Sequence, residues 1–266
     1  MKTTAAAASN MQDAKATGRD TRKAVLEGSI RTNVPLRKTF VQANAGGASR
    51  HGPLKEFVTG RDLRGLKAYL LIVAACSNGV NGWSTTRDSL VWARMLDIVE
   101  TTNKDQSART GAWRALLRLR ARKLIDCHRS GTKITVTLLR EDGTGQPYDR
   151  PKGVIEEDRY LQIPATFWTT GRDEPLDLPG LAMFLVVARE KNWSSFPLEK
   201  APEWYGWSAD THERGLNKLL ALDLVERREK YIKAPLAPAG FVKTYQYKRT
   251  AAVQPRKAKK AVAAAP

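Results

Sequence analysis

The chain has 266 residues, and 45 Lys and Arg against 27 Asp and Glu give it a net charge of +18 and an isoelectric point near 10.1. This length accommodates two cores of ordinary domain size, and the charge favours a polyanionic partner. The longest apolar run, Tyr69 to Cys76, is far shorter than the roughly 20 residues that span a bilayer, and the N-terminus lacks the apolar core of a signal peptide. We therefore expect neither a membrane protein nor a secreted one.

The two cysteines, Cys76 and Cys127, have no disulfide-framework spacing and fit a reducing compartment. We expect a cytoplasmic, nucleoid-associated protein, and the Ala-, Arg- and Trp-rich composition points to a GC-rich bacterial source.

The ends of the chain are basic and poor in large apolar residues. Residues 1–52 carry nine Lys and Arg and three acids, whereas 250–266 carry four basic residues and no acid. Such segments bury too little surface to offset their ordering entropy, so we predict a largely disordered basic arm and a disordered basic tail. Within the arm, Val34 to Val41 is the part expected to lie against the first domain.

The first domain is predicted over 53–140. Leu63 to Cys76 is apolar at helical spacing. Thr85 and Thr86 with Asp88 can cap a second helix, which extends through Met95, and Ser107 can cap a third. The segments 125–129 and 134–139 then alternate like the strands of a hairpin, or wing.

A Gly-, Pro- and Asp-rich linker is predicted over 141–158, followed by a second domain over 159–249. There, Leu178 to Glu190 repeats the first core helix, 199–207 takes the place of the second helix and 208–222 that of the third. The segments 231–232 and 241–247 supply the second wing.

The third helix is the clearest repeat. The run SARTGAWRALLRLRARKLID (107–126) is followed 101 residues later by SADTHERGLNKLLALDLVE (208–226), and each copy ends in Leu, then Ile or Val, then an acid. The stretch 107–123 holds six basic residues and no acid. Arg114, Arg118 and Arg122 form a ridge of like charge that an anion would relieve. A merely solvated basic face is the alternative to a DNA-binding one.

Arginine reads guanine edges and phosphates in bidentate fashion, whereas hydroxyls and wings contact the backbone. In the first domain Ser107 and Thr110 are expected to hold the backbone, Arg109 or Arg114 to reach a guanine, and Arg118 and Arg122 to meet phosphates. Gly111 lies on the outer side, where a small residue permits close approach to DNA. The predicted wing contacts are Arg129 and Lys133, with His128 nearby.

The third helix of the second domain, 208–222, is nearly neutral. Ala209, His212, Leu216, Leu219 and Leu220 are predicted to face inward, and Asp210, Thr211, Arg214, Gly215 and Lys218 outward. Asp210 and Glu213 would repel phosphates, so this domain either assists in reading DNA or binds a protein partner, including a second copy. The following basic residues favour DNA; they are Arg227, Arg228, Lys230 and Lys233.

No catalytic or metal-binding pattern is present in the sequence. It lacks a Gly-rich phosphate loop ending in Gly-Lys-Ser/Thr, and its three histidines are scattered. Cys127 and His128 are neighbours on a strand and would point to opposite faces. The acidic run 156–158 is expected to be solvated. We predict no enzyme activity, no metal and no cofactor.

The element order and the two quoted runs resemble tandem winged-helix DNA-binding proteins, similar to MarR-like regulators in each domain and to plasmid replication initiators in the paired arrangement. The resemblance implies an α+β fold, mainly helical with small β-wings, made of two winged helix-turn-helix domains. It implies sequence-specific binding of double-stranded DNA, first of all by a transcriptional regulator that acts by occupancy. The alternatives are a plasmid or phage replication initiator and a protein-interaction scaffold with nonspecific nucleic-acid tails.

Overall fold

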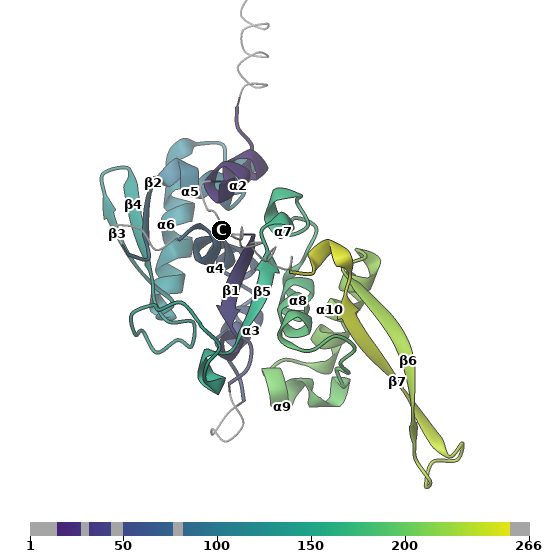
Figure 1. The fold of residues 1–266 in the computed structure, drawn as a ribbon. Coiled ribbons are helices and arrows are strands. Elements are labelled where there is room, and N and C mark those ends of the chain that lie inside the picture. Colours follow the sequence, from purple (N-terminus) through teal and green to yellow (C-terminus); the bar gives the residue numbers. More distant parts are fainter. Residues whose placement is uncertain (1–14, 28–31, 44–49, 77–81, 256–266) are drawn as a thin grey trace, which may run out of the picture.

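The computed structural model describes residues 15–27, 32–43, 50–76 and 82–255. Over these residues the fold combines helices with three small antiparallel sheets, in two halves that lie side by side (Figure 1). The expected α+β class is confirmed.

The first half contains three helices and a three-stranded sheet. Its elements are α4 (Leu63–Ala75), β2 (Ser84–Asp88), α5 (Ser89–Met95), α6 (Asp105–Ala121), β3 (Ile125–Ser130) and β4 (Lys133–Leu138). The strand order is β2-β4-β3, with Thr86 opposite Thr135. Strand β2 was not predicted, because its sequence STTRD has no apolar alternation and becomes a strand only through pairing with β4. Asp88 caps α5 by accepting a hydrogen bond from the Leu90 N–H at 2.8 Å.

From α8 onward the second half repeats this order, except that no strand among its described residues takes the place of β2. Its elements are β5 (Tyr160–Pro164), α7 (Thr166–Thr169), α8 (Leu178–Arg189), α9 (Ala201–Tyr205), α10 (Ala209–Ala221), β6 (Val225–Lys233) and β7 (Phe241–Arg249). Ser194 and Tyr247 exchange two backbone hydrogen bonds of 3.2 and 2.9 Å, which places Ser194 beside β7 in the position that β2 has beside β4. Ser208 caps α10 through the Thr211 N–H, as predicted. Five short 3-10 helices connect the main elements: η1 (Lys38–Phe40), η2 (Val99–Thr101), η3 (Glu156–Asp158), η4 (Leu198–Lys200) and η5 (Ala251–Val253).

The N-terminal segment is folded between the halves. It forms α2 (Gly18–Glu27), β1 (Asn33–Arg37) and α3 (Leu54–Thr59), and β1 pairs with β5 of the second half. Phe40 stacks on Tyr69 of α4 with ring centroids 5.0 Å apart. The prediction of a disordered arm is therefore wrong for 18–27, which forms a helix, whereas 34–41 packs against the first half as expected and also pairs with the second. Residues 1–14, 28–31 and 44–49 of the predicted arm lie outside the described residues.

Two buried arginines fasten this segment. Arg22 of α2 contacts Asp97 of the first half and Glu174 of the second, each at 2.8 Å. Arg37 of β1 is fully buried and contacts Glu141, Asp149 and Asp158 at 2.5 to 2.9 Å.

The predicted linker and tail are also partly packed. Glu141 and Tyr148 are buried, and Asp158 of the acidic run binds Arg37 rather than standing in solvent. Val253 is buried as well, so the disordered tail predicted from residue 250 is wrong for 250–255. The remaining tail, 256–266, lies outside the described residues.

Candidate nucleic-acid interface

Helix α6 presents one face to solvent and packs through the other against α4 and α5. Its buried residues are Ala108, Ala112, Ala115, Leu116 and Leu119. The helix begins at Asp105, so Ser107 lies in its first turn and is exposed, and is not the cap that we predicted. Leu117 is 37 % exposed on the outer face beside Arg114, although its apolar character would favour the core.

Gly111 and Gly215 do not lie on an open outer face, contrary to the prediction. A Cβ at Gly111 would be 3.0 Å from Cγ2 of Ile98, and one at Gly215 would be 2.4 Å from the Pro179 carbonyl oxygen. Each glycine therefore lets its helix approach a neighbouring protein segment closely, which is a packing role rather than room for DNA.

The ridge arginines of α6 have different partners. Arg118 contacts both Asp62 carboxylate oxygens at 2.9 and 3.0 Å, and Arg122 contacts Asp62 at 2.7 Å. Burial opposes ionisation of Asp62, but the hydrogen bonds from these two arginines lower its pKa to about 2. The anion that relieves the ridge is thus internal. Arg114 is exposed and makes no side-chain ion pair within the described ranges.

The other predicted contacts on α6 are also tied into the fold. The Arg109 guanidinium donates to Asp88 at 2.8 Å and to the Ser89 hydroxyl at 2.5 Å, which holds α6 to the start of α5. The Thr110 hydroxyl donates to the Gln106 carbonyl within the helix at 2.9 Å. Of the residues named for base or phosphate contact on this helix, Ser107 and Arg114 are the most available.

The β3–β4 hairpin lies beside α6 and turns at Gly131, whose φ is 58° (Figure 1). His128, Arg129 and Lys133 are all exposed on it, whereas Cys127 is buried, so Cys127 and His128 face opposite ways as predicted. The Arg129 Nε donates to the Gly131 carbonyl at 2.9 Å and leaves the rest of the guanidinium at the surface. The hairpin therefore adds two exposed cations next to the exposed face of α6.

Helix α10 is the counterpart of α6 in the second half. Arg214 is 61 % exposed and pairs with Asp210 at 3.0 Å, Thr211 and Lys218 are half-buried, and His212 is fully buried as predicted. The charge on this helix is thus partly cancelled, consistent with its sequence.

The turn between α3 and α4 lies beside both α6 and α10. Arg61 of this turn lines one cavity together with Thr211 and Arg214 of α10, and the next residue, Asp62, binds Arg118 of α6. The turn therefore contacts α6 through the buried Asp62 and borders α10 through Arg61, two residues that nothing in the sequence marked out.

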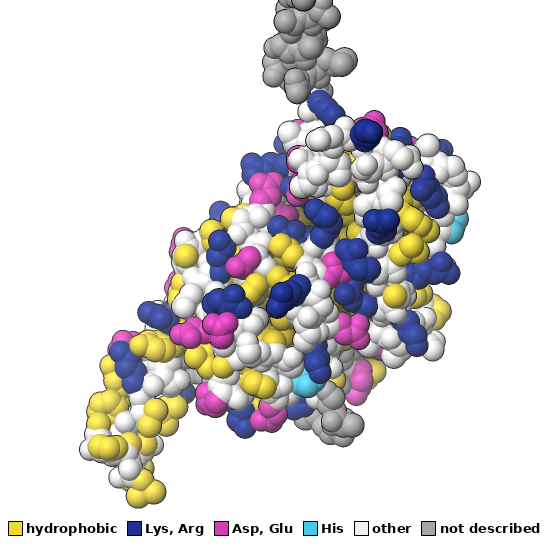
Figure 2. All heavy atoms as spheres, turned by 180° about the vertical axis from the view of Figure 1, so that it is seen from behind, with side chains coloured by type: hydrophobic (Ala, Val, Ile, Leu, Met, Phe, Trp, Pro, Cys, Tyr) yellow, Lys and Arg dark blue, Asp and Glu magenta, His cyan; other side chains and the backbone are white. Residues whose placement is uncertain are grey.

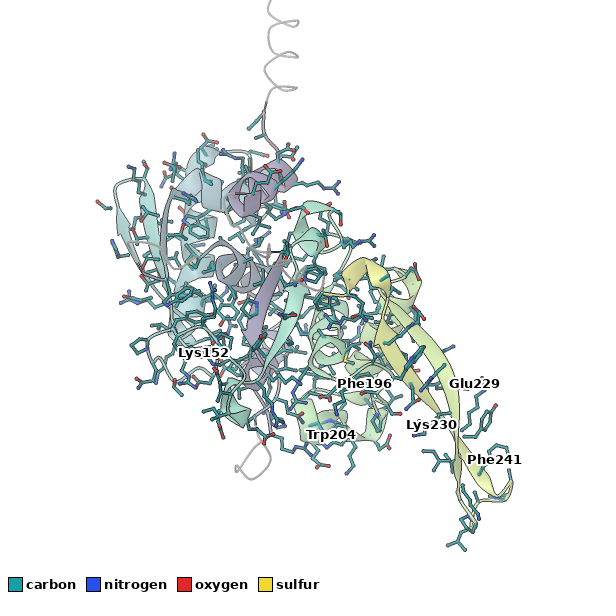
Figure 3. All side chains as sticks on the ribbon, viewed as in Figure 1. Lys152, Phe196, Trp204, Glu229, Lys230 and Phe241 are labelled. Carbon is teal, nitrogen blue, oxygen red and sulfur yellow. The ribbon has the colours of Figure 1, made fainter. Side chains whose placement is uncertain are left out.

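The β6–β7 hairpin carries the remaining predicted cations. Arg227 lies over the Tyr245 ring at 4.6 Å and Arg228 over Trp193 at 4.3 Å. Glu229 and Lys230 follow them along the projecting hairpin (Figure 3). Both strands are longer than predicted, since β6 begins at Val225 and not near Tyr231.

No protein-family model, curated protein or solved structure matches this chain. No helix among the described residues is long and apolar enough to cross a membrane. In the same ranges, no group of three or more His, Cys, Asp and Glu side chains is arranged to hold a metal ion.

Proposed function

We propose that the chain binds double-stranded DNA through two winged-helix modules and that the first module makes most of the direct contacts. The carrying observation is the repeated order of core helix, two further helices and hairpin. In the first half β4 lies between β2 and β3, and in the second half β7 lies between β6 and a single bridge at Ser194. In winged helix-turn-helix proteins the last helix before the hairpin enters the major groove. That helix here is α6, which exposes Arg114 next to the basic β3–β4 hairpin.

A transcriptional regulator that acts by occupying its site is the leading form of this proposal. One further observation favours a plasmid or phage replication initiator. Arg22 contacts Asp97 of the first half and Glu174 of the second, which fixes the two modules of the chain against each other. A single chain of this kind suits two adjacent half-sites without dimerisation. Direct repeats beside an AT-rich tract at the genomic locus would support the initiator, and a divergent promoter would support the regulator.

Replacing Arg114 by Ala should weaken binding to the preferred duplex by about 1–3 kcal/mol, because a bidentate arginine–guanine contact has this value. Binding to random duplex should weaken less. The preferred sequence is first selected from a random duplex library with the full-length protein, and fluorescence anisotropy across a salt series then measures both affinities.

Arg120→Ala is the matched control, since Arg120 is an exposed α6 arginine that already pairs with Asp126 at 3.1 Å. It should reduce affinity for both duplexes slightly and equally. Equal large losses from Arg114→Ala on both duplexes would make Arg114 a phosphate contact. Failure to select any duplex sequence would overturn the proposal in favour of the scaffold.

A further inference from the structure

The β6–β7 hairpin projects well beyond the body of the molecule, and Phe241 lies towards its outer end (Figures 1 and 3). Each strand has nine residues, which corresponds to about 30 Å at the usual rise per residue. The corresponding β3–β4 hairpin has strands of six residues and a polar turn at Ser130 to Thr132. The two hairpins therefore differ in both reach and chemistry.

The outer half of the hairpin exposes apolar side chains on both faces, and one face also carries Lys233 and Lys243, which lie opposite Phe241 and Tyr231. Tyr231 and Phe241 pack edge to face on one side with ring centroids 5.3 Å apart, and Ile232 is opposite Val242 on the other. Leu236 is fully exposed at the end, in a segment that also holds Pro235 and Pro238. Apolar side chains predominate on the hairpin in Figure 2, whereas charged ones are spread over the body. Each Leu or Phe side chain left in water forgoes about 1.5–3 kcal/mol of burial free energy. An exposed apolar surface of this size therefore indicates a binding role.

The inner half of the hairpin is basic. Residues 225–230 and 244–249 hold five Lys and Arg and two acids. Glu226 and Glu229 are each paired, with Lys248 and Lys243, and Arg227, Arg228 and Lys230 remain exposed around them. A cationic stem below an apolar end is complementary to duplex DNA, because the stem can neutralise phosphates while apolar side chains enter a base step.

We propose that the apolar end of the β6–β7 hairpin inserts between base pairs of duplex DNA and unstacks them, while the basic stem contacts the phosphates. Apolar wedges on DNA-binding proteins act in this way and kink the duplex. This inference rests on the proposed duplex binding and adds that the protein distorts its site rather than only occupying it. It places the unstacked step at the end of the duplex that faces the second module.

The test uses full-length protein on the selected duplex, with 2-aminopurine placed at successive steps and a donor–acceptor dye pair at the ends. Binding should raise the 2-aminopurine fluorescence at one or two neighbouring steps and bring the ends closer. The variant Leu236→Ser with Phe241→Ser should abolish the fluorescence increase and reduce the end-to-end change. Because both side chains are exposed, this variant should keep the wild-type unfolding temperature.

Val154→Ser is the matched control, because Val154 is 83 % exposed on the body away from the hairpin, and it should leave both signals unchanged. Binding without any rise in 2-aminopurine fluorescence would overturn the wedge and leave duplex binding intact. A hairpin variant that instead converts a self-associated protein to monomers in sedimentation, without altering fluorescence on DNA, would overturn it in favour of a contact between two copies. Absence of binding to any duplex would mean that the proposed function itself fails.

Discussion

Arg37→Ala should destabilise the protein by about 3–5 kcal/mol, because removing one partner of a buried ion pair leaves the other charge unpaired. Arg37 and Glu141 are both fully buried, and the Arg37 Nη1 lies 2.5 Å from Glu141 Oε2 and 2.8 Å from the Asp149 carbonyl oxygen. The substitution also removes the contacts that hold β1 against residues 141–158. Urea unfolding followed by tryptophan fluorescence measures the loss.

A double variant separates pairing from packing. Arg37→Met with Glu141→Leu should be more stable than Arg37→Met alone, since replacing both members of a buried pair by apolar groups of similar size is often nearly neutral. Arg159→Ala is the surface control, because Arg159 and Glu156 are 59 % and 63 % exposed, and its effect should be below about 0.5 kcal/mol. An Arg37→Ala protein within 1 kcal/mol of wild type would contradict the assignment of Arg37 as the fastener of this segment.

The sequence could not reveal Arg37 or Arg22 because their partners are far away along the chain. Glu141 follows Arg37 by 104 residues, and Glu174 follows Arg22 by 152. In sequence terms both arginines belong to a basic arm, in which the stretch around Arg22 was predicted to be disordered and the stretch around Arg37 only to lie against the first domain. Only the burial of these arginines between the two halves shows that the arm is structural.

Apolar periodicity in the sequence located the core helices well, but it could not show which segments pack against them. The core helices α4 and α8 and the β3–β4 hairpin lie within two residues of their predicted bounds, because each has strong apolar spacing. A helical wheel, however, cannot show that another segment covers part of the polar face, and so Gly111 and Gly215 were placed towards solvent. The same limit hid Asp62, which pairs with two of the three ridge arginines from the α3–α4 turn.

Two buried groups, His212 and Asp173, should change the stability of the protein with pH in opposite directions. Burial lowers the pKa of His212, which is stacked on Tyr205 with ring centroids 5.7 Å apart, to about 4. Burial raises the pKa of Asp173, beside Arg22 and Lys67, to about 6. Below its ordinary pKa near 6.5, His212 takes up a proton in the unfolded chain first, so acidification from pH 7 to 5 should cost about 2 kcal/mol of stability.

Asp173 acts in the opposite direction over the same window. Its folded form takes up a proton near pH 6, whereas the unfolded carboxyl does so only near its ordinary value of about 3.9, so acidification from pH 7 to 5 should add about 1 kcal/mol. In the wild type the two contributions partly cancel.

Asp173→Asn should therefore expose the histidine contribution, and His212→Phe the aspartate contribution. From pH 7 to 5, we expect the first variant to lose about 1 kcal/mol more stability than wild type, and the second to lose about 2 kcal/mol less than wild type. Urea unfolding at half-unit pH intervals measures all three proteins, and taking differences from wild type removes the contributions of the other carboxylates and histidines. Parallel curves for the three proteins would show that neither group is as buried in solution as its packing between α9 and α10, or between α2 and α4, requires.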